Sequence, residues 1–302
     1  MRVSLKRAAV VVIFFGTSFL APGLGLALAQ ESTPSSVSSS GALSSGALSP
    51  DAFSLGDLST MTVRVCGNSA YPPVSWVNAE RQATGVNVAV IKQLLEPLGV
   101  TVDTYQDSNW RRCLKEVELG NIDMLSGFDT ASRRASMTFL TEPLVREDIY
   151  LYYPIDQPLT FKGWDALAGL RVGVLMGDSF GDAIDDALET YPTLEYVSTQ
   201  AQNLRKLANR RLDAVPMGKL SGQLDLQRLG LLGKTGHVQT DVTDFWYLAI
   251  SNRSPLLPWV PFLNQRLSAL LASPDTIPEL LSRYHTLYLR DVGLKDRHQR
   301  EP

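Results

Sequence analysis

The stretch Gly120–Pro143, GNIDMLSGFDTASRRASMTFLTEP, decides the fold of this chain. It opens with Gly-Asn, a pair that supplies the left-handed residues that end a helix, and residues 122–125 then have the pattern of a short buried strand. Residues 126–130 are small and polar, so the backbone there can present N–H groups and hydroxyls. Arg133 and Arg134 follow directly, and a guanidinium fork can hold a planar carboxylate through two hydrogen bonds. The stretch therefore indicates an anion site, unless the two arginines simply face solvent on a helix.

The front of the chain has the composition of a secretory signal peptide, predicted over residues 1–29. An apolar run over 8–20 follows three positive charges, and a small-residue Ala-Leu-Ala site precedes Gln30. The alternative is an uncleaved anchor, because the apolar character continues weakly to residue 29. Residues 30–60 are mostly Ser, Gly, Ala and Leu, and they are predicted to be a flexible linker because they bury too little apolar surface. We therefore expect an exported, periplasmic protein whose folded part begins near residue 61.

Composition excludes several classes of function. The chain has 28 Lys and Arg against 31 Asp and Glu, a net charge of −3, so it lacks the basic footprint of a nucleic-acid-binding protein. Its three histidines and two cysteines show no metal-ligand spacing. No stretch after the signal is long and apolar enough to span a bilayer. No metal, cofactor or nucleic-acid partner is expected.

The two cysteines are Cys66 and Cys113. In an exported chain they could form one disulfide, or they could remain two buried thiols. The bridge is the hypothesis carried forward.

Strands and helices alternate after residue 61. The hydrophobic pattern predicts strands over 61–65, 100–105 and 122–125 and helices over 88–98 and 110–119. Short units in this βαβαβ order are typical of a parallel, doubly wound sheet. Tyr71 then lies on a loop at the carboxyl end of the first strand, the edge at which ligands bind in such sheets.

The second half repeats this alternation. Strands are predicted over 149–155, 170–176, 194–197, 213–217 and 247–250, a helical turn over 164–167, and helices over 182–190, 202–211, 256–271 and 277–289. The Gly177–Gly181 turn leads into the helix that starts at Asp182, where free backbone N–H groups favour an anion.

A set of short motifs occurs in a fixed order between residues 61 and 289. They are Tyr71-Pro72-Pro73 after the first strand, Gly85-Val86-Asn87-Val88 before the first helix, Trp110 before the second, Gly120-Asn121-Ile122-Asp123 at its exit, and Thr130-x-x-Arg133 followed by Phe139 and Pro143. In this order and spacing the chain resembles the bacterial extracellular solute-binding protein family 3, the periplasmic polar amino-acid-binding components of ABC transporters.

The resemblance implies an α/β fold of the type II periplasmic-binding-protein kind. Two lobes, each with a mainly parallel sheet flanked by helices, would enclose a ligand cleft. Lobe 1 would comprise residues 61–152 and 249–290 and lobe 2 residues 153–248, with a polar tail over 291–302. The implied function is capture of a small polar, carboxylate-bearing solute, an amino acid or related compound, for an inner-membrane ABC permease. The protein would be a monomer and not an enzyme.

The family's carboxylate clamp can be assigned to either arginine. Counting back from Phe139 selects Arg133, whereas counting forward from Gly127 selects Arg134. We favour Arg133, because Thr130 then stands three residues before it, as in the family pattern.

The resemblance also implies the rest of the binding site, with one departure. The other expected ligand-binding residues are Tyr71, Trp76, Trp110, Gly127, Asp129, Thr130, Gly177, Asp178, Ser179 and Phe180. Amino-acid binders place an aspartate for the ligand's ammonium where this chain has Gly218. Asp178 or Asp129 could take over that role, and the sequence does not decide between them.

Three alternative functions are open. Residues 177–181 spell G-x-S-x-G between a strand and a helix, so Ser179 could be a hydrolase nucleophile. Its acid would be Asp213 or Asp241 and its base His237 or His285. Some proteins of the resembled fold are dehydratases acting on prephenate-like (cyclohexadienyl) carboxylates, and others are ligand-sensing modules. A dehydratase would need a proton donor in the cleft.

Overall fold

Parallel strands joined by helices begin the folded part of the chain. In the computed structural model, which describes residues 58–106 and 109–298, β1 (Thr62–Arg64) pairs in parallel with β4 (Thr101–Asp103). The helix between them, α2 (Val86–Leu95), is buried along most of its length. On the other side of β1, a parallel bridge joins Val65 to Met124, the first residue of β5 (Met124–Phe128). The predicted parallel βαβαβ arrangement is confirmed.

Helix α3 (Trp110–Leu119) lies between β4 and β5, with the bounds predicted from the sequence. The Asn109 side chain caps its start by accepting a hydrogen bond from the Arg112 backbone N–H at 3.0 Å. Gly120 ends it in the left-handed conformation, with φ of 82°. The chain therefore enters β5 at the point where the central stretch of the sequence begins.

A second group of parallel strands follows. Strand β8 (Arg171–Leu175) pairs in parallel with β9 (Thr193–Val197), and a parallel bridge from Val172 to Ala214 leads to β10 (Val215–Gly218). Helices α5 (Asp182–Thr190) and α6 (Gln200–Ala208) connect these strands. Helix α7 (Lys219–Arg228), which follows β10 directly, was not predicted.

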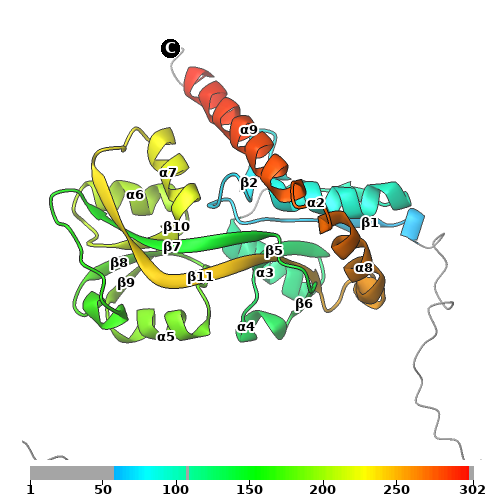
Figure 1. Ribbon diagram of the computed structural model, residues 1–302, viewed down its shortest axis with the longest axis horizontal. Coiled ribbons are helices and arrows are strands. Elements are labelled where there is room, and N and C mark those ends of the chain that lie inside the picture. The colour runs from blue at the N-terminus through cyan, green and yellow to red at the C-terminus, as the bar shows by residue number, and fades with distance from the viewer. Residues whose placement is uncertain (1–57, 107–108, 299–302) are drawn as a thin grey trace, which may run out of the picture. The chain divides into compact units, whose positions relative to one another are not determined.

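Two long antiparallel strands, β7 (Val145–Pro154) and β11 (Thr235–Ser251), join the two groups of strands. The hydrogen-bonded order β10-β7-β11-β5 runs from one group to the other (Figure 1). We call β1 to β6 with α8 and α9 lobe 1, and β8 to α7 lobe 2. The remaining elements are β2 (Trp76–Val77), β3 (Ala83–Thr84), η2 (Glu96–Leu98), α4 (Ala131–Arg134), β6 (Met137–Phe139), η3 (Trp164–Leu167), η4 (Leu257–Trp259), α8 (Val260–Leu271) and α9 (Thr276–His298).

Both connecting strands are longer than predicted. The strand expected over 247–250 is only the buried end of β11, whose earlier residues alternate between exposed and partly buried positions. Polar residues such as Gln239, Asp241 and Thr243 break the apolar run there, so an apolar pattern alone does not mark that half of the strand. The partner strand β7 fixes it instead, through a ladder from Thr235–Pro154 to Trp246–Val145 with one irregularity between Gln239 and Thr243.

The last helix contacts both lobes. The Trp76 indole N–H of lobe 1 donates to Asp291 of α9 at 3.1 Å, and the Tyr288 hydroxyl of α9 donates to Asp225 of α7 at 2.8 Å. The two helices, one orange to red and one yellow, lie close together in Figure 1. Helix α9 extends to His298 and so includes residues expected to be a polar tail.

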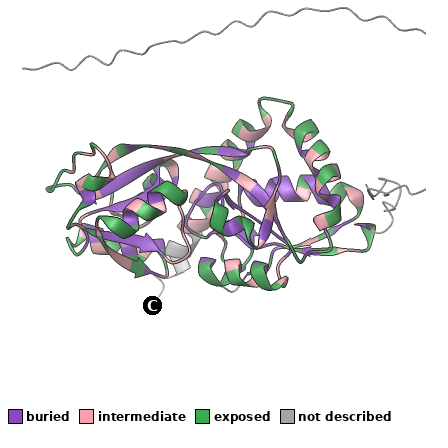
Figure 2. Cartoon of the chain, turned by 90° about the horizontal axis from the view of Figure 1, so that it is seen from below, coloured by how far each residue is buried: buried purple, intermediate pink, exposed green. Residues whose placement is uncertain are grey.

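The core lies along the strands and the inner faces of the helices. Figure 2 shows buried residues along the strands and exposed residues on the outer sides of the helices. Within residues 58–106 and 109–298 no helix has the length and apolarity needed to cross a membrane. The predicted signal peptide and linker, residues 1–29 and 30–60, lie outside the described residues apart from the last three.

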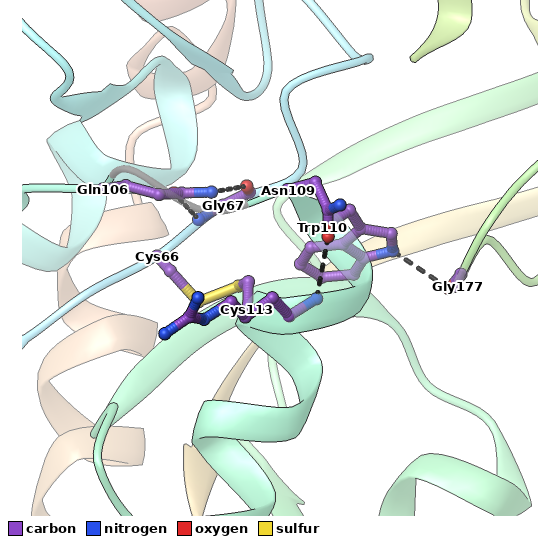
Figure 3. The surroundings of a disulfide bond; sticks show 8 residues. Cys66, Gly67, Gln106, Asn109, Trp110, Cys113 and Gly177 are labelled. Atoms are coloured by element: carbon purple, nitrogen blue, oxygen red, sulfur yellow. Dashed lines mark hydrogen bonds between the residues drawn. A yellow bond between two sulfur atoms is a disulfide. The ribbon is translucent and has the colours of Figure 1, made fainter. Parts of the chain in front are cut away.

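Cys66 and Cys113 form a disulfide, with their Cα atoms 6.0 Å apart (Figure 3). Cys66 follows β1 and Cys113 lies in α3, and both are buried. Next to the bridge, the Gln106 amide exchanges two hydrogen bonds with the backbone of Gly67, at 2.9 and 3.1 Å. The bridge thus holds the loop after β1 against the helix that starts with Trp110.

Reduction of this disulfide should lower the melting temperature and leave the fold intact. Closing a loop between residues 47 positions apart stabilises the folded state by about 4 kcal/mol in the chain-entropy description. Most of the core does not depend on the bridge, so we expect a cooperative transition at lower temperature. Calorimetry with and without reductant measures the shift. Two alkylatable thiols in untreated exported protein would contradict the bridge.

Candidate functional site

Side chains of both lobes and of β11 enclose a small cavity. Its volume of about 10 Å³ leaves room for about one water molecule. The cavity is lined by Asn68, Tyr71, Trp110, Gly127, Phe128, Arg133, Asp178, Ser179 and Trp246. Six of these nine residues were predicted ligand-binding residues, and three, Asn68, Phe128 and Trp246, were not.

Arg133 brings a buried positive charge to this cavity. Its side chain comes from the short helix α4, and the residue is 8% exposed. The guanidinium donates to the backbone oxygens of Phe128 at 3.0 Å and Gly177 at 3.3 Å, and it lies over the Trp110 ring at 5.6 Å. No carboxylate of the described residues forms an ion pair with it. A Cβ on Gly127 would lie 3.0 Å from the guanidinium, so this glycine makes room for it.

Gly177 of lobe 2 packs closely against α3 of lobe 1. Its φ of +89° favours glycine, and a Cβ would lie 3.2 to 3.3 Å from atoms of Trp110, Arg111 and Leu114. Its carbonyl accepts from the Trp110 indole N–H at 3.0 Å, as Figure 3 shows, in addition to Arg133. A side chain at this position would hold the lobes apart.

Asp178 places a carboxylate inside the cavity. One oxygen accepts from the Asn68 amide at 2.7 Å and the other from the Tyr71 hydroxyl at 3.1 Å. Burial raises the pKa of Asp178 to about 6, against the hydrogen bond from Asn68 and the charge of Arg133, which lower it. Burial and the neighbouring Asp178 likewise raise the pKa of Tyr71. Tyr71 was predicted to form part of the aromatic wall of the ligand site. In this conformation its hydroxyl instead bonds to an acid of lobe 2.

The turn before α5 is occupied by an acid of its own helix. The Ser179 hydroxyl donates to Asp185, and the Phe180 backbone N–H donates to the same carboxylate at 2.9 Å. Phe180 itself is buried. The N–H and hydroxyl groups expected to face an external anion are therefore engaged with Asp185 in this conformation.

Four other predicted residues lie outside the cavity lining. Arg134 is exposed and forms an ion pair with Asp129 at 2.6 Å, so these two charges satisfy each other at the surface. Thr130 caps α4 by accepting from the Arg133 backbone N–H at 3.4 Å. Trp76 packs against Tyr284 and Tyr288 of α9 and not against the cavity. We therefore remove Trp76 from the expected aromatic wall.

Trp246 completes that wall in its place. Its ring lies 4.9 Å from Tyr71 and 5.0 Å from Phe128, between centroids. Its indole N–H donates at 3.3 Å to Glu147, a buried acid on the neighbouring strand β7. Sequence reasoning missed Glu147, because the strand was predicted to begin at residue 149, whereas β7 begins at Val145 and includes this acid.

The hydrolase arrangement is not assembled. Ser179 donates to Asp185, and none of its hydrogen bonds among the described residues involves a histidine. Asp213 pairs with Arg171 at 2.8 Å, and His237 lies beside the rings of Tyr150 and Tyr152. No group of three or more His, Cys, Asp and Glu in the described part of the chain is placed to hold a metal ion.

The two buried acids should make stability depend on pH. Burial raises the pKa of Glu147 to about 7 and that of Asp178 to about 6. Both values exceed those of the unfolded chain, so the folded state binds more protons and stability falls as pH rises from about 4 to 7. Between pH 5 and pH 8 we expect the wild type to lose about 1 to 3 kcal/mol more unfolding free energy than Glu147→Gln/Asp178→Asn. Urea denaturation of both proteins at the two pH values measures this difference; equal losses would refute it.

Residues 63–223, more than half of the chain, match the family described as bacterial extracellular solute-binding proteins, family 3. The chain belongs to this family. A relative, the proposed ABC transporter arginine-binding protein 2 of Escherichia coli (strain K12), is 24% identical over 164 residues. That match covers 54% of this chain and 65% of the relative, so the chain spans less than two thirds of the relative's length.

Solved structures with the same fold include transport proteins and sensor domains. The substrate-binding protein AbpA of a Streptococcus pneumoniae amino acid ABC transporter, bound to L-arginine, matches with a TM-score of 0.63 and 15% identity, over 75% of this chain and 95% of that one. The periplasmic VFT2 domain of Bordetella pertussis BvgS matches with a TM-score of 0.62 and 19% identity, over 76% and 95%. At this identity the likeness shows the type II binding-protein fold alone.

Proposed function

We propose that this family 3 protein binds a small polar solute between its two lobes and holds the solute's carboxylate through Arg133. The observation that supports this most directly is a buried guanidinium without an ionic partner among the described residues. A buried charge is costly unless it is paired. A carboxylate from solution would supply the missing partner through two parallel hydrogen bonds.

The cavity in this conformation is too small for a solute of that kind. A solute would therefore enter when the lobes move apart, which would break the polar contacts between them around the cavity. They include the hydrogen bonds from Asn68 and Tyr71 to Asp178 and those from Trp110 and Arg133 to Gly177. Movement about the connecting strands β7 and β11 would break these bonds and leave each lobe's core intact.

The same proposal includes a biological role in uptake, which is taken from the family. A signal peptide over residues 1–29 would export the protein to the periplasm, and the bound amino acid or related compound would pass to an inner-membrane ABC permease. The relative from E. coli is named for arginine and for such a transporter, which supports the class of solute.

A thermal-shift screen of the mature protein against amino acids, organic acids and amines tests this proposal. A solute that binds only the folded state at a hundred times its dissociation constant stabilises it by about 2.7 kcal/mol. In a domain of this size that raises the melting temperature by about 5 to 10 °C. We expect the active compounds to share a carboxylate. If only compounds without a carboxylate shift the transition, the proposal fails.

A dehydratase is a second candidate, favoured by one observation. Asp178 is an acid inside the cavity whose pKa, raised by burial to about 6, suits proton transfer near neutral pH. Asp129, the other acid considered, is paired with Arg134 at the surface. An assay of product formation from a prephenate-like carboxylate, with Asp178→Asn as the control, separates turnover from binding.

A further inference from the structure

Glu147 carries a buried carboxylate that no cation accompanies. The residue is 5% exposed and stands opposite Asp244 in the β7–β11 ladder. Its carboxylate accepts from the Trp246 indole N–H at 3.3 Å and from the backbone N–H of Lys219. Both donors are neutral, and no positive side chain in the described part of the chain forms an ion pair with it.

A carboxylate in this environment is costly to the folded protein. Withdrawing an ion from water costs several kcal/mol, and neutral donors offset only part of it. The charge that acts on it, that of Asp148 on the same strand, is also negative, and the residue opposite it in the ladder, Asp244, is a third acid. An apolar residue or a glutamine would pack here at lower cost, so the charge itself calls for an explanation.

The start of α7 is shaped around this carboxylate. A Cβ on Gly218 would lie 2.2 Å from Oε1 of Glu147 and 2.4 Å from its carboxyl carbon. A side chain at position 218 would therefore have to displace the Glu147 carboxylate from its present place. The φ of −60° and ψ of 145° at Gly218 are open to any residue, so the glycine serves the carboxylate and not the backbone.

The carboxylate also lies next to the cavity. Trp246, which donates to it, lines the cavity, and Glu147 acts on the hydroxyl of Tyr71 in the same aromatic wall, although Glu147 itself is not a lining residue. A buried guanidinium, that of Arg133, and a buried acid, Glu147, thus lie at or next to one site.

We propose that Glu147 receives a cationic group of the bound solute and that Gly218 provides the space for its carboxylate. This inference rests on the proposed function, in which Arg133 holds the carboxylate of the same solute. The solute class is then one that bears a carboxylate and a protonated amine together. Glu147 fits this role better than Asp178, because the charge of Arg133 already acts on Asp178, whereas the side chains that act on Glu147 carry no positive charge.

Matched probe pairs that differ only in the α-amino group test the inference. Suitable pairs are L-arginine with 5-guanidinopentanoate, L-glutamate with glutarate, L-aspartate with succinate and L-leucine with 4-methylpentanoate. By calorimetry, the wild type should bind the amino acid of at least one pair about 30-fold or more tighter than its partner. In Glu147→Gln, which keeps the size and the Trp246 acceptor, that ratio should fall to about 3 or less, chiefly through weaker binding of the amino acid.

A rescue variant tests the geometry. Gly218→Asp alone should lower the melting temperature, because its Cβ overlaps Glu147. Glu147→Ala removes that overlap and should also abolish the preference for the amino acid over its desamino partner. Glu147→Ala/Gly218→Asp then returns a carboxylate to the same place. We expect this double variant to recover at least half of the lost discrimination on a logarithmic scale, with a melting temperature above that of Gly218→Asp.

The outcomes separate this inference from the proposed function. Arg133→Ala should weaken both members of a pair, and the surface variant Arg134→Ala should weaken neither. If Glu147→Gln binds with the wild-type ratio, or if Asp178→Asn alone abolishes the ratio, the inference is overturned while carboxylate binding stands. If the wild type binds only the desamino partners, the inference also fails. If no carboxylate binds, both proposals fall.

Discussion

Replacing Arg133 with alanine should weaken binding of the carboxylate solute by about thirty-fold to several-thousand-fold. Truncating one member of a buried, hydrogen-bonded charge pair typically costs about 2 to 5 kcal/mol, because the other charge is left unpaired in a desolvated site. Arg133 is buried in the cavity, and its fork is held by two backbone carbonyls and the Trp110 ring. Calorimetry with the solute found by thermal shift measures the loss.

Three further variants show whether the fork itself matters. Arg133→Lys should recover little affinity, because a point charge cannot reproduce the planar pair of donors. Ser179→Ala should cost about 1 kcal/mol or less, since its hydroxyl already donates to Asp185. Arg134→Ala should change affinity very little, because Arg134 pairs with Asp129 at the surface. If Arg134→Ala weakens binding strongly and Arg133→Ala does not, the clamp is Arg134. If neither substitution weakens binding, the clamp is refuted.

The second large effect is expected on stability, from Gly85→Ala. Gly85 precedes α2 with φ of 121° and ψ of −176°, a conformation that essentially only glycine adopts. An added Cβ would also lie 2.3 Å from the backbone oxygen of Val74, and the main chain there cannot swing aside as a side chain could. Strain and overlap together should cost about 3 kcal/mol or more. That corresponds to a fall in melting temperature of about 6 to 12 °C for a domain of this size.

Gly169→Ala is the matched control for this variant. Gly169 also has a positive φ, of 75°, but nothing lies within 4 Å of the position of its Cβ. Its replacement should cost only the conformational term, about 1 kcal/mol. Comparing the two melting temperatures therefore separates the combined effect of the Gly85 conformation and its contact with Val74 from the cost of replacing an unhindered glycine. Equal shifts would mean that this combined effect is absent.

The sequence by itself determined much of the architecture. Apolar periodicity predicted β1, α3 and β5 in order, and the residues that end α3 gave its exact bounds, because caps and periodicity are local properties. The motifs from Tyr71 to Pro143 identified the family that the match over residues 63–223 now shows. They also favoured Arg133 over Arg134 as the carboxylate clamp, which stays a prediction; in the structure Arg133 is buried and Arg134 is exposed.

Only the tertiary structure decided which charges meet. The sequence placed Asp129, Asp178 and Ser179 in one group of ligand-binding residues. In the folded protein Asp129 pairs with Arg134 at the surface, and Ser179 donates to Asp185. Asp178 instead accepts hydrogen bonds from Asn68 and Tyr71, which lie more than a hundred residues away in the sequence. Trp76 lies against α9 and Trp246 of β11 lines the cavity for the same reason, since the packing of distant elements decides which aromatic rings reach the site. Glu147 and Gly218 lie on neighbouring strands, and their contact depends on the β7–β10 register. Such pairings depend on long-range packing, which no local pattern encodes.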